Sequence, residues 1–217
     1  MELNGKKILF LGDSITEGAG VSDINDVYWK QLEKNTDAEC VGYGIGGTRF
    51  SRQPEPDEFD ERGNFCDRCL KMDDKADIIV VFGGTNDYGH GNAPFGRLGD
   101  CTPETFCGAV SFVAKSLIEK YPDALTVFMT PTHRLSEKGR TKNENGIRND
   151  AELKDYVDGI IKICGEYSLP VLDLYRVSGI QPEIEIMREK YMPDGLHPNK
   201  YGNAKIASRL EGFLRAL

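Results

Sequence analysis

Long apolar runs and an excess of positive charge are both missing from this sequence. No apolar stretch approaches the ~20 residues that a membrane-spanning helix needs. The apolar run at 8–11 is also shorter than the ~7–15 residues of a signal-peptide core. The chain has 27 Lys and Arg against 35 Asp and Glu, a net charge of -8. Nucleic acids and anionic membranes attract basic patches. The sequence therefore predicts neither partner, and it predicts a cytoplasmic protein unless a leader has been trimmed.

Cysteine and histidine are also scarce. Six cysteines are too few and too scattered over 217 residues for a disulfide scaffold. Cys66 and Cys69 have the spacing of a zinc knuckle, but Cys101 and Cys107 are separated by five residues and lack it. We expect free thiols and no metal site. The sequence indicates no cofactor. It is compatible with a homo-oligomer, although no feature of the sequence indicates one.

What the chain does contain is typical of one globular α/β domain over residues 1–217. Apolar residues make up 39% and charged residues 29%. Continuous apolar, β-branched runs predict strands that are buried on both faces. The predicted strands are 7–11, 39–42, 78–82, 125–130 and 169–174.

Apolar residues at intervals of three and four predict helices between these strands. Three such helices are marked by Phe106, Val110, Val113 and Leu117; by Leu153, Val157, Ile160 and Cys164; and by Ala207, Leu210, Leu214 and Leu217. Strands that alternate with helices favour a three-layer, doubly wound parallel sheet with helices on both faces. A chain of this length suits the flavodoxin-like strand order 2-1-3-4-5.

In such sheets ligands bind beyond the carboxyl ends of the strands. Three Gly-rich loops follow the first three predicted strands, at 12–14, 42–48 and 83–87. The polar segment 49–77 and the Gly-rich segment 89–100 are long connections, which in compact domains are usually functional or mobile. We expect the acidic part, 55–77, to be a solvated loop or lid.

Ser14 is the candidate nucleophile, because it directly follows the first predicted strand. A serine hydroxyl needs a base to take its proton and a third group to orient that base. His197 and Asp194 lie three residues apart, close enough in a turn for the carboxylate to bond to Nδ1. Pro198 disfavours helical dihedrals at His197 and keeps the pair on a loop. Each motif alone has a structural interpretation, since Gly-Asp-Ser is also a common turn and helix cap.

Taken together, the motifs resemble those of the SGNH hydrolases, also called the GDSL esterase and lipase family. Gly-Asp-Ser-Ile at 12–15 resembles the serine block, and Gly-Gly-Thr at 46–48 the glycine block. Gly-Thr-Asn-Asp at 84–87 resembles the asparagine block, and Asp-Gly-Leu-His-Pro at 194–198 the last one. All four occur in order and span nearly the whole chain. A Gly-x-Ser-x-Gly elbow is lacking, which argues against an ordinary α/β-hydrolase.

The resemblance implies a serine esterase that works through an acyl-enzyme, with Ser14, Asp194 and His197 as triad. It also implies an oxyanion hole made of Ser14, Gly47 and Asn86, with Gly46 as the competitor of Gly47. Gly42 stands where many members have asparagine, in a loop with extra glycine, so either Gly47 or Gly46 can be the donor. The polar segment and the absence of an apolar patch favour a small acyl group, such as acetyl, on a polar or carbohydrate alcohol. Further substrate contacts are expected from five residues: Asp13, Arg49, Asp87, His90 and His133.

Other functions stay open at this point. A lysophospholipase or thioesterase of the same family would use the same groups, and so would a phosphodiesterase. A non-catalytic binding member of the fold is a further alternative. Residues 42–47 also match the Gly-x-Gly-x-x-Gly pattern of dinucleotide sites. The polar stretch with Pro54 and Pro56 that follows is unlike the helix such a site needs.

Overall fold

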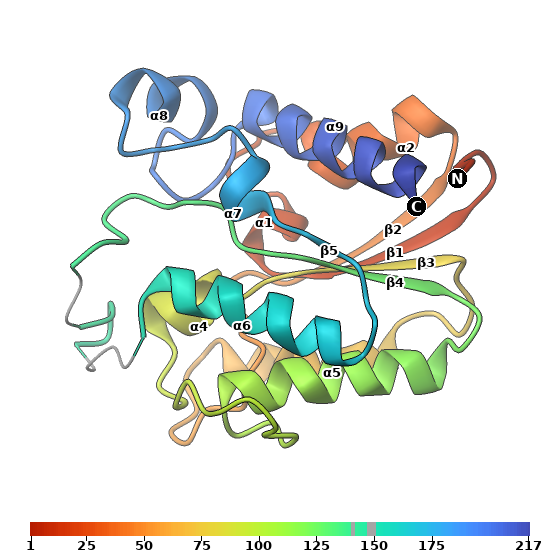
Figure 1. Ribbon diagram of the computed structural model, residues 1–217. Helices are drawn as coiled ribbons and strands as arrows, with labels where there is room; N and C mark the ends of the chain where they lie inside the picture. Colours follow the sequence, from red (N-terminus) through yellow and green to blue (C-terminus); the bar gives the residue numbers. More distant parts are fainter. Residues whose placement is uncertain (140–141, 147–150) are drawn as a thin grey trace.

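The computed structural model describes residues 1–139, 142–146 and 151–217. In these residues a sheet of five parallel strands has the order β2-β1-β3-β4-β5 (Figure 1). The strands are β1 (Lys7–Gly12), β2 (Glu39–Gly44), β3 (Ile78–Phe82), β4 (Leu125–Met129) and β5 (Val171–Leu172). The predicted flavodoxin-like order is confirmed. The reversal of strand order lies between β1 and β3, where such sheets bind ligands.

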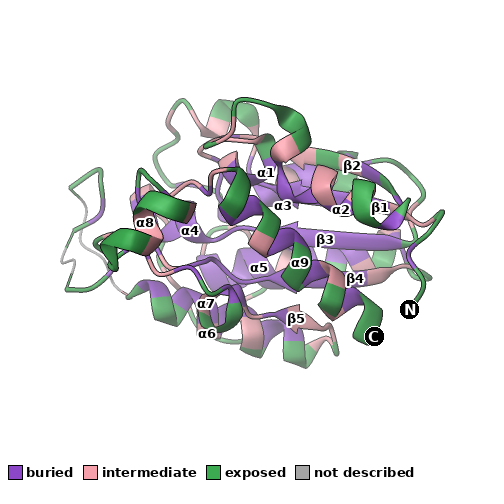
Figure 2. Ribbon diagram, turned by 90° about the horizontal axis from the view of Figure 1, so that it is seen from above, coloured by how far each residue is buried: buried purple, intermediate pink, exposed green. Residues whose placement is uncertain are grey.

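Helices cover both faces of the sheet because the side chains of its central strands alternate between two apolar layers (Figures 1 and 2). Leu9 and Val81 belong to the core on one face, and Ile8, Phe10 and Val80 to the core on the other. The first core includes residues of α5 (Phe106–Lys120) and α6 (Leu153–Glu166). The second includes residues of α2 (Tyr28–Thr36) and α9 (Lys200–Ala216).

The three predicted helices correspond to α5, α6 and the later part of α9. The last helix begins earlier than its apolar spacing indicated, because the Asn199 side chain accepts from the amides of Tyr201 and Gly202 and caps it. Shorter helices and 3-10 turns fill the connections. They are α1 (Ser14–Glu17), α3 (Phe65–Arg68), α4 (Thr85–His90), α7 (Leu174–Val177), α8 (Glu185–Tyr191), η1 (Ile24–Asp26), η2 (Asp60–Arg62) and η3 (Cys69–Lys71).

The fifth strand is shorter than predicted, two residues instead of the span 169–174. Pro170 has no N–H and so cannot donate to a sheet ladder. Asp173 ends the strand on the other side, because its side chain accepts from the Arg176 amide and caps α7. The apolar run is therefore divided between a short edge strand and a helix start.

The expectation of a solvated loop over 55–77 is wrong for its second half. Phe65, Cys66, Cys69 and Met72 are buried and belong to the core on the α5 face. Their spacing of one, three and three residues is that of a helical turn, and α3 and η3 form there. The surrounding acidic and basic residues concealed this pattern in the sequence. No helix in the described ranges is long and apolar enough to cross a membrane.

Candidate active site

Ser14 lies at the carboxyl edge of the sheet, as the first residue of α1. Asp13 precedes it and caps the helix by accepting a hydrogen bond from the Ile15 amide at 3.0 Å. The Ser14 amide therefore stands in the first turn of a helix, where N–H groups have no intrahelical partner. Both the Ser14 hydroxyl and the Ser14 backbone N–H, which the helix leaves without a partner, therefore lie beyond the end of β1.

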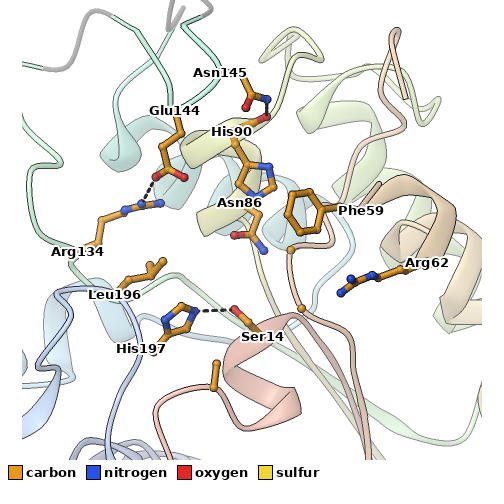
Figure 3. A pocket seen from close by; sticks show the side chains of 13 residues that line it. Ser14, Phe59, Arg62, Asn86, His90, Arg134, Glu144, Asn145, Leu196 and His197 are labelled. Atoms are coloured by element: carbon orange, nitrogen blue, oxygen red, sulfur yellow. Dashed lines mark hydrogen bonds and ion pairs between the residues drawn. The ribbon is translucent and has the colours of Figure 1, made fainter. Parts of the chain in front are cut away.

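Three side chains form a hydrogen-bonded row beside this helix. The Ser14 Oγ lies 3.0 Å from His197 Nε2 (Figure 3). On the other side of the ring, His197 Nδ1 lies 2.7 Å from Asp194 Oδ2. The other oxygen of Asp194 accepts from the amides of Leu196 at 2.9 Å and His197 at 2.7 Å. Partial burial disfavours the charged carboxylate, but these bonds outweigh it and hold the Asp194 pKa below its usual value. The carboxylate is thus ionised and fixed.

The loop that carries this pair is anchored at several points. The Leu135 amide donates to the Gly195 carbonyl at 2.7 Å. Gly195 has φ +79°, a conformation that glycine adopts without strain. Pro198 and Asn199 follow and lead into α9. The imidazole is therefore held between a helix cap and the loop after β4.

The Gly-rich loop after β2 presents one amide to the same space. The Gly46 N–H donates to the Glu17 carboxylate at 3.0 Å. The Gly47 N–H, by contrast, has no hydrogen-bond partner within the described part of the chain, and Gly47 lines the pocket. Of the two glycines, Gly47 is the one with a donor available. Its φ of +76° and the Phe59 ring, which would lie 2.0 Å from an added Cβ, both require glycine there.

Asn86 enters the pocket from the start of α4. Its Nδ2 donates to the Thr48 carbonyl at 3.0 Å. A side-chain amide nitrogen carries two N–H groups, so the second is available to a ligand. The bond to Thr48 also links α4 to the Gly-rich loop, which keeps the two donors together.

These groups surround a pocket of about 410 Å³. That volume lies in the range of small-molecule sites. The lining residues that the close-up labels are Ser14, Phe59, Arg62, Asn86, His90, Arg134, Glu144, Asn145, Leu196 and His197 (Figure 3). Ala19, Gly46 and Gly47 complete the wall.

Of the five residues expected to contact substrate, His90 lines this pocket, and its ring is neutral. Burial, together with the neighbouring Arg49 charge, lowers its pKa to about 4. Arg49 Nη1 lies 3.1 Å from His90 Nδ1. Arginine can only donate, so Nδ1 accepts and the proton of the neutral ring sits on Nε2.

The other four expected substrate contacts lie outside the pocket wall. Asp13 and Asp87 are buried, and Asp87 accepts from Phe50 and Ser51. Burial raises the pKa of Asp13 to about 6. Arg49 is fully buried and ion-paired with Asp57 and Asp60. His133 bonds to the buried Glu137 at 2.6 Å. Each of these four side chains is hydrogen-bonded or ion-paired with another part of the protein.

Several pocket residues were not identified from the sequence. Phe59 and Arg62 come from the polar segment, where the acidic composition indicated only a surface loop. Arg134, Glu144 and Asn145 follow β4, and Arg134 Nη2 donates to the Glu144 carboxylate at 2.6 Å. The rule that ligands bind beyond strand ends also applies to β4. The position of this loop after β4 was therefore the one signal in the sequence that could have identified these pocket residues.

The cysteines stay apart from the pocket. Cys40, Cys66, Cys69, Cys107 and Cys164 are buried and Cys101 is exposed, all as free thiols. Among residues 1–139, 142–146 and 151–217, no group of three or more His, Cys, Asp or Glu side chains could hold a metal ion.

Comparison with known proteins agrees with this arrangement. The model of the GDSL-like lipase/acylhydrolase family matches residues 10–205. The chain belongs to this family. No curated protein matches it.

Solved structures extend the comparison. A protein from Lactobacillus plantarum is 31% identical, with a TM-score of 0.83 over 98% of both chains. A proposed GDSL-like lipase from Bacteroides uniformis has the same fold at 19% identity, with a TM-score of 0.71 over 98% of this chain and 97% of that one. A two-domain esterase active on acetylated mannans is 20% identical, with a TM-score of 0.65; the match covers 98% of this chain and 49% of that one.

Proposed function

We propose that this member of the GDSL-like lipase/acylhydrolase family is a serine esterase that cleaves small acyl esters of polar alcohols through an acyl-enzyme. The observation that carries the proposal is the row from Ser14 Oγ through His197 to Asp194, which opens into a pocket with backbone and amide donors. A nucleophile, a base and an orienting acid are the three groups that acyl transfer requires.

The mechanism follows from these contacts. His197 Nε2 takes the proton of Ser14 as the Oγ attacks the ester carbonyl, and then gives it to the leaving alcohol. Asp194 fixes the tautomer in which Nδ1 carries a proton, and it stabilises the imidazolium. The resulting acyl-serine is hydrolysed when His197 activates a water molecule by the same route. Ser14 is thereby regenerated.

The amides of Ser14 and Gly47 and the Asn86 side chain are the proposed oxyanion donors. Charge develops on the carbonyl oxygen during attack, and donors already aimed at it lower the barrier. Removing one such donor typically costs about 3 kcal/mol of transition-state stabilisation. The link between Asn86 and Thr48 supports this role, because it holds the side chain beside the Gly-rich loop before substrate arrives.

A short acyl group is supported by the wall of the pocket. Phe59 lies directly over Gly47, so a long chain has an aromatic ring in its way on that side. The activity of a fold relative on acetylated mannans makes acetylated carbohydrate a reasonable first substrate to test.

Hydrolysis of p-nitrophenyl esters tests the proposal. We expect release of p-nitrophenol from acetate faster than from the twelve-carbon laurate, and loss of both activities in Ser14→Ala. Ser51→Ala is the matched control, because Ser51 is buried and bonded to Asp87 away from the pocket. Equal rates for wild type and Ser14→Ala would refute the esterase, and a fluorophosphonate adduct on another residue would refute the assigned nucleophile. Faster cleavage of laurate would point to the lysophospholipase alternative, and acetylated sugars would then be replaced by lysolipids in the next test.

A further inference from the structure

Arg62 carries a positive charge in the pocket wall and forms no ion pair within the described residues. It ends η2, is exposed, and lines the pocket with Ser14 and Phe59. The close-up shows its guanidinium directed toward the space beside Ser14 (Figure 3). Its side chain forms no hydrogen bond in the described ranges, and its guanidinium carbon lies 5.7 Å from the centroid of the Phe59 ring.

The other basic side chains near this space already have partners. Arg134 is paired with Glu144, and Arg49 with Asp57 and Asp60. His90 is neutral and is held by Arg49.

An uncommitted guanidinium in a pocket wall suits an anionic ligand. Its planar N–H groups match carboxylate, phosphate and sulfate oxygens, and they form shorter and stronger bonds with these than with neutral groups. The distant part of the net charge of -8 opposes this little, because charges farther away than ~8 Å are largely screened at physiological salt. Of the acidic residues in the same segment, Asp57 and Asp60 are paired with Arg49.

We infer that Arg62 is a specificity residue for an anion, so that the preferred substrate is a small ester with a carboxylate, phosphate or sulfate near the scissile bond. The inference rests on the proposed esterase function and narrows its substrate class. The anion belongs either to the acyl group or to the alcohol, and both would present the same chemistry to the guanidinium.

Two pairs of esters of matched size test the inference and separate these sources. For the acyl side, p-nitrophenyl hemisuccinate is compared with p-nitrophenyl butyrate. For the alcohol side, 4-acetoxybenzoate is compared with its methyl ester. We expect a higher kcat/KM for the anionic member of one pair. Arg62→Gln should lower that anionic-to-neutral ratio about fivefold, and Arg62→Glu should lower it further.

Salt and a second arginine provide the controls. In the wild type the ratio should fall as ionic strength rises, which loss of packing alone would not produce. Arg52→Gln makes the same charge change on the same segment, but Arg52 pairs with Asp67 and Glu104 outside the pocket, so the ratio should stay unchanged. No anionic preference in either pair, or one that Arg62→Gln leaves intact, overturns the inference while the esterase stands. Absence of Ser14-dependent hydrolysis of all four esters overturns both.

Discussion

Individual residues at the carboxyl edge of the sheet are defined by what they are bonded to. Ser14 and His197 face each other in the pocket. Asp13, which directly precedes Ser14, and Asp87, which directly follows Asn86, are instead buried in the protein. Neighbours in sequence thus have opposite surroundings. The difference affects charge, since burial raises the pKa values of Asp13 and Asp87 while hydrogen bonds lower that of Asp194.

Asp13 gives the protein a pH-dependent stability. Its pKa of about 6 in the fold exceeds the ordinary 3.8, so the folded state binds this proton more tightly than the unfolded state. The resulting stabilisation is complete below pH 3.8 and is lost as the pH rises through about 6. Asp13→Asn has no proton to lose and keeps an oxygen for the Ile15 amide. Its free energy of unfolding should exceed that of the wild type by about 3 kcal/mol at pH 8 and by little near pH 4.

Denaturant unfolding at several pH values, followed by Trp29 fluorescence, measures this difference. Asp23→Asn is the matched control, because Asp23 caps η1 through the Asn25 amide but is exposed to solvent. We expect no comparable increase in the free energy of unfolding for Asp23→Asn. Parallel pH profiles for Asp13→Asn and the wild type would show that burial of the carboxyl does not govern stability.

At the scale of elements, the Gly-rich loop after β2 is held from three sides. Glu17 on α1 bonds to the Gly46 amide, and Asn86 on α4 bonds to the Thr48 carbonyl. Arg68 on α3 is buried, donates to the carbonyls of Gly12 at 3.0 Å and Tyr43 at 2.8 Å, and reaches the Thr48 hydroxyl. The polar segment 49–77 thereby fastens the ends of β1 and β2 as well as contributing to the pocket.

The contact from Glu17 predicts a positioning role. Glu17 lies one turn after Ser14, and its hydrogen bond links the helix of the proposed nucleophile to the loop of the proposed oxyanion donor. Glu17→Ala should lower kcat on p-nitrophenyl acetate about tenfold with KM little changed, since misplacing a donor weakens an interaction made only in the transition state. Glu17→Gln should retain most of kcat, because its Oε1 can still accept.

Glu39→Ala is the matched control for this pair of variants. Glu39 is exposed and lies at the first residue of β2, at the opposite end of that strand from the Gly-rich loop. Its removal should leave both kinetic constants near those of the wild type. A Glu17→Ala enzyme with an unchanged kcat would show that the loop keeps its position without this bond.

On the scale of the whole molecule, one sheet separates two apolar cores that share its strands. Leu117 of α5 is buried in one core and Leu210 of α9 in the other. Trp29, the one tryptophan of the sequence, lies in the second core. Because adjacent residues of β1 and β3 face opposite cores, loosening either core disturbs the strands of both.

Unfolding is therefore expected to be a single transition. Leu117→Ala should lower the free energy of unfolding by about 2–5 kcal/mol. It should shift the Trp29 fluorescence midpoint as much as the far-ultraviolet circular dichroism midpoint, although Trp29 is on the other face. Leu210→Ala, on the same face as Trp29, provides the comparison. A fluorescence midpoint that stays in place in Leu117→Ala while the dichroism midpoint moves would mean that the two cores unfold separately.

Local pattern was sufficient to predict the order of the sheet. Apolar runs and helical spacings depend on neighbouring residues, so they could be read without long-range contacts. Three of the four motifs follow the first three strands, and the fourth directly precedes α9. The predicted ends of strands and helices were less accurate where local signals in the sequence compete. At β5, Pro170 and the Asp173 cap shortened an apolar run, and near Phe65 the charged neighbours concealed a buried turn.

By itself the sequence determined the family and the strand order, because family motifs and apolar runs are contiguous in the chain. It also predicted the site residues Ser14, Asn86, Asp194 and His197, from two motifs that follow strands and one that precedes the last helix. Only the tertiary structure showed that the Gly46 N–H is already bonded, since that bond depends on the Glu17 side chain reaching across from α1. It also decided that Arg49 is buried while Arg62 faces the pocket. Both are arginines of one polar segment, and their different surroundings come from residues far away in the chain.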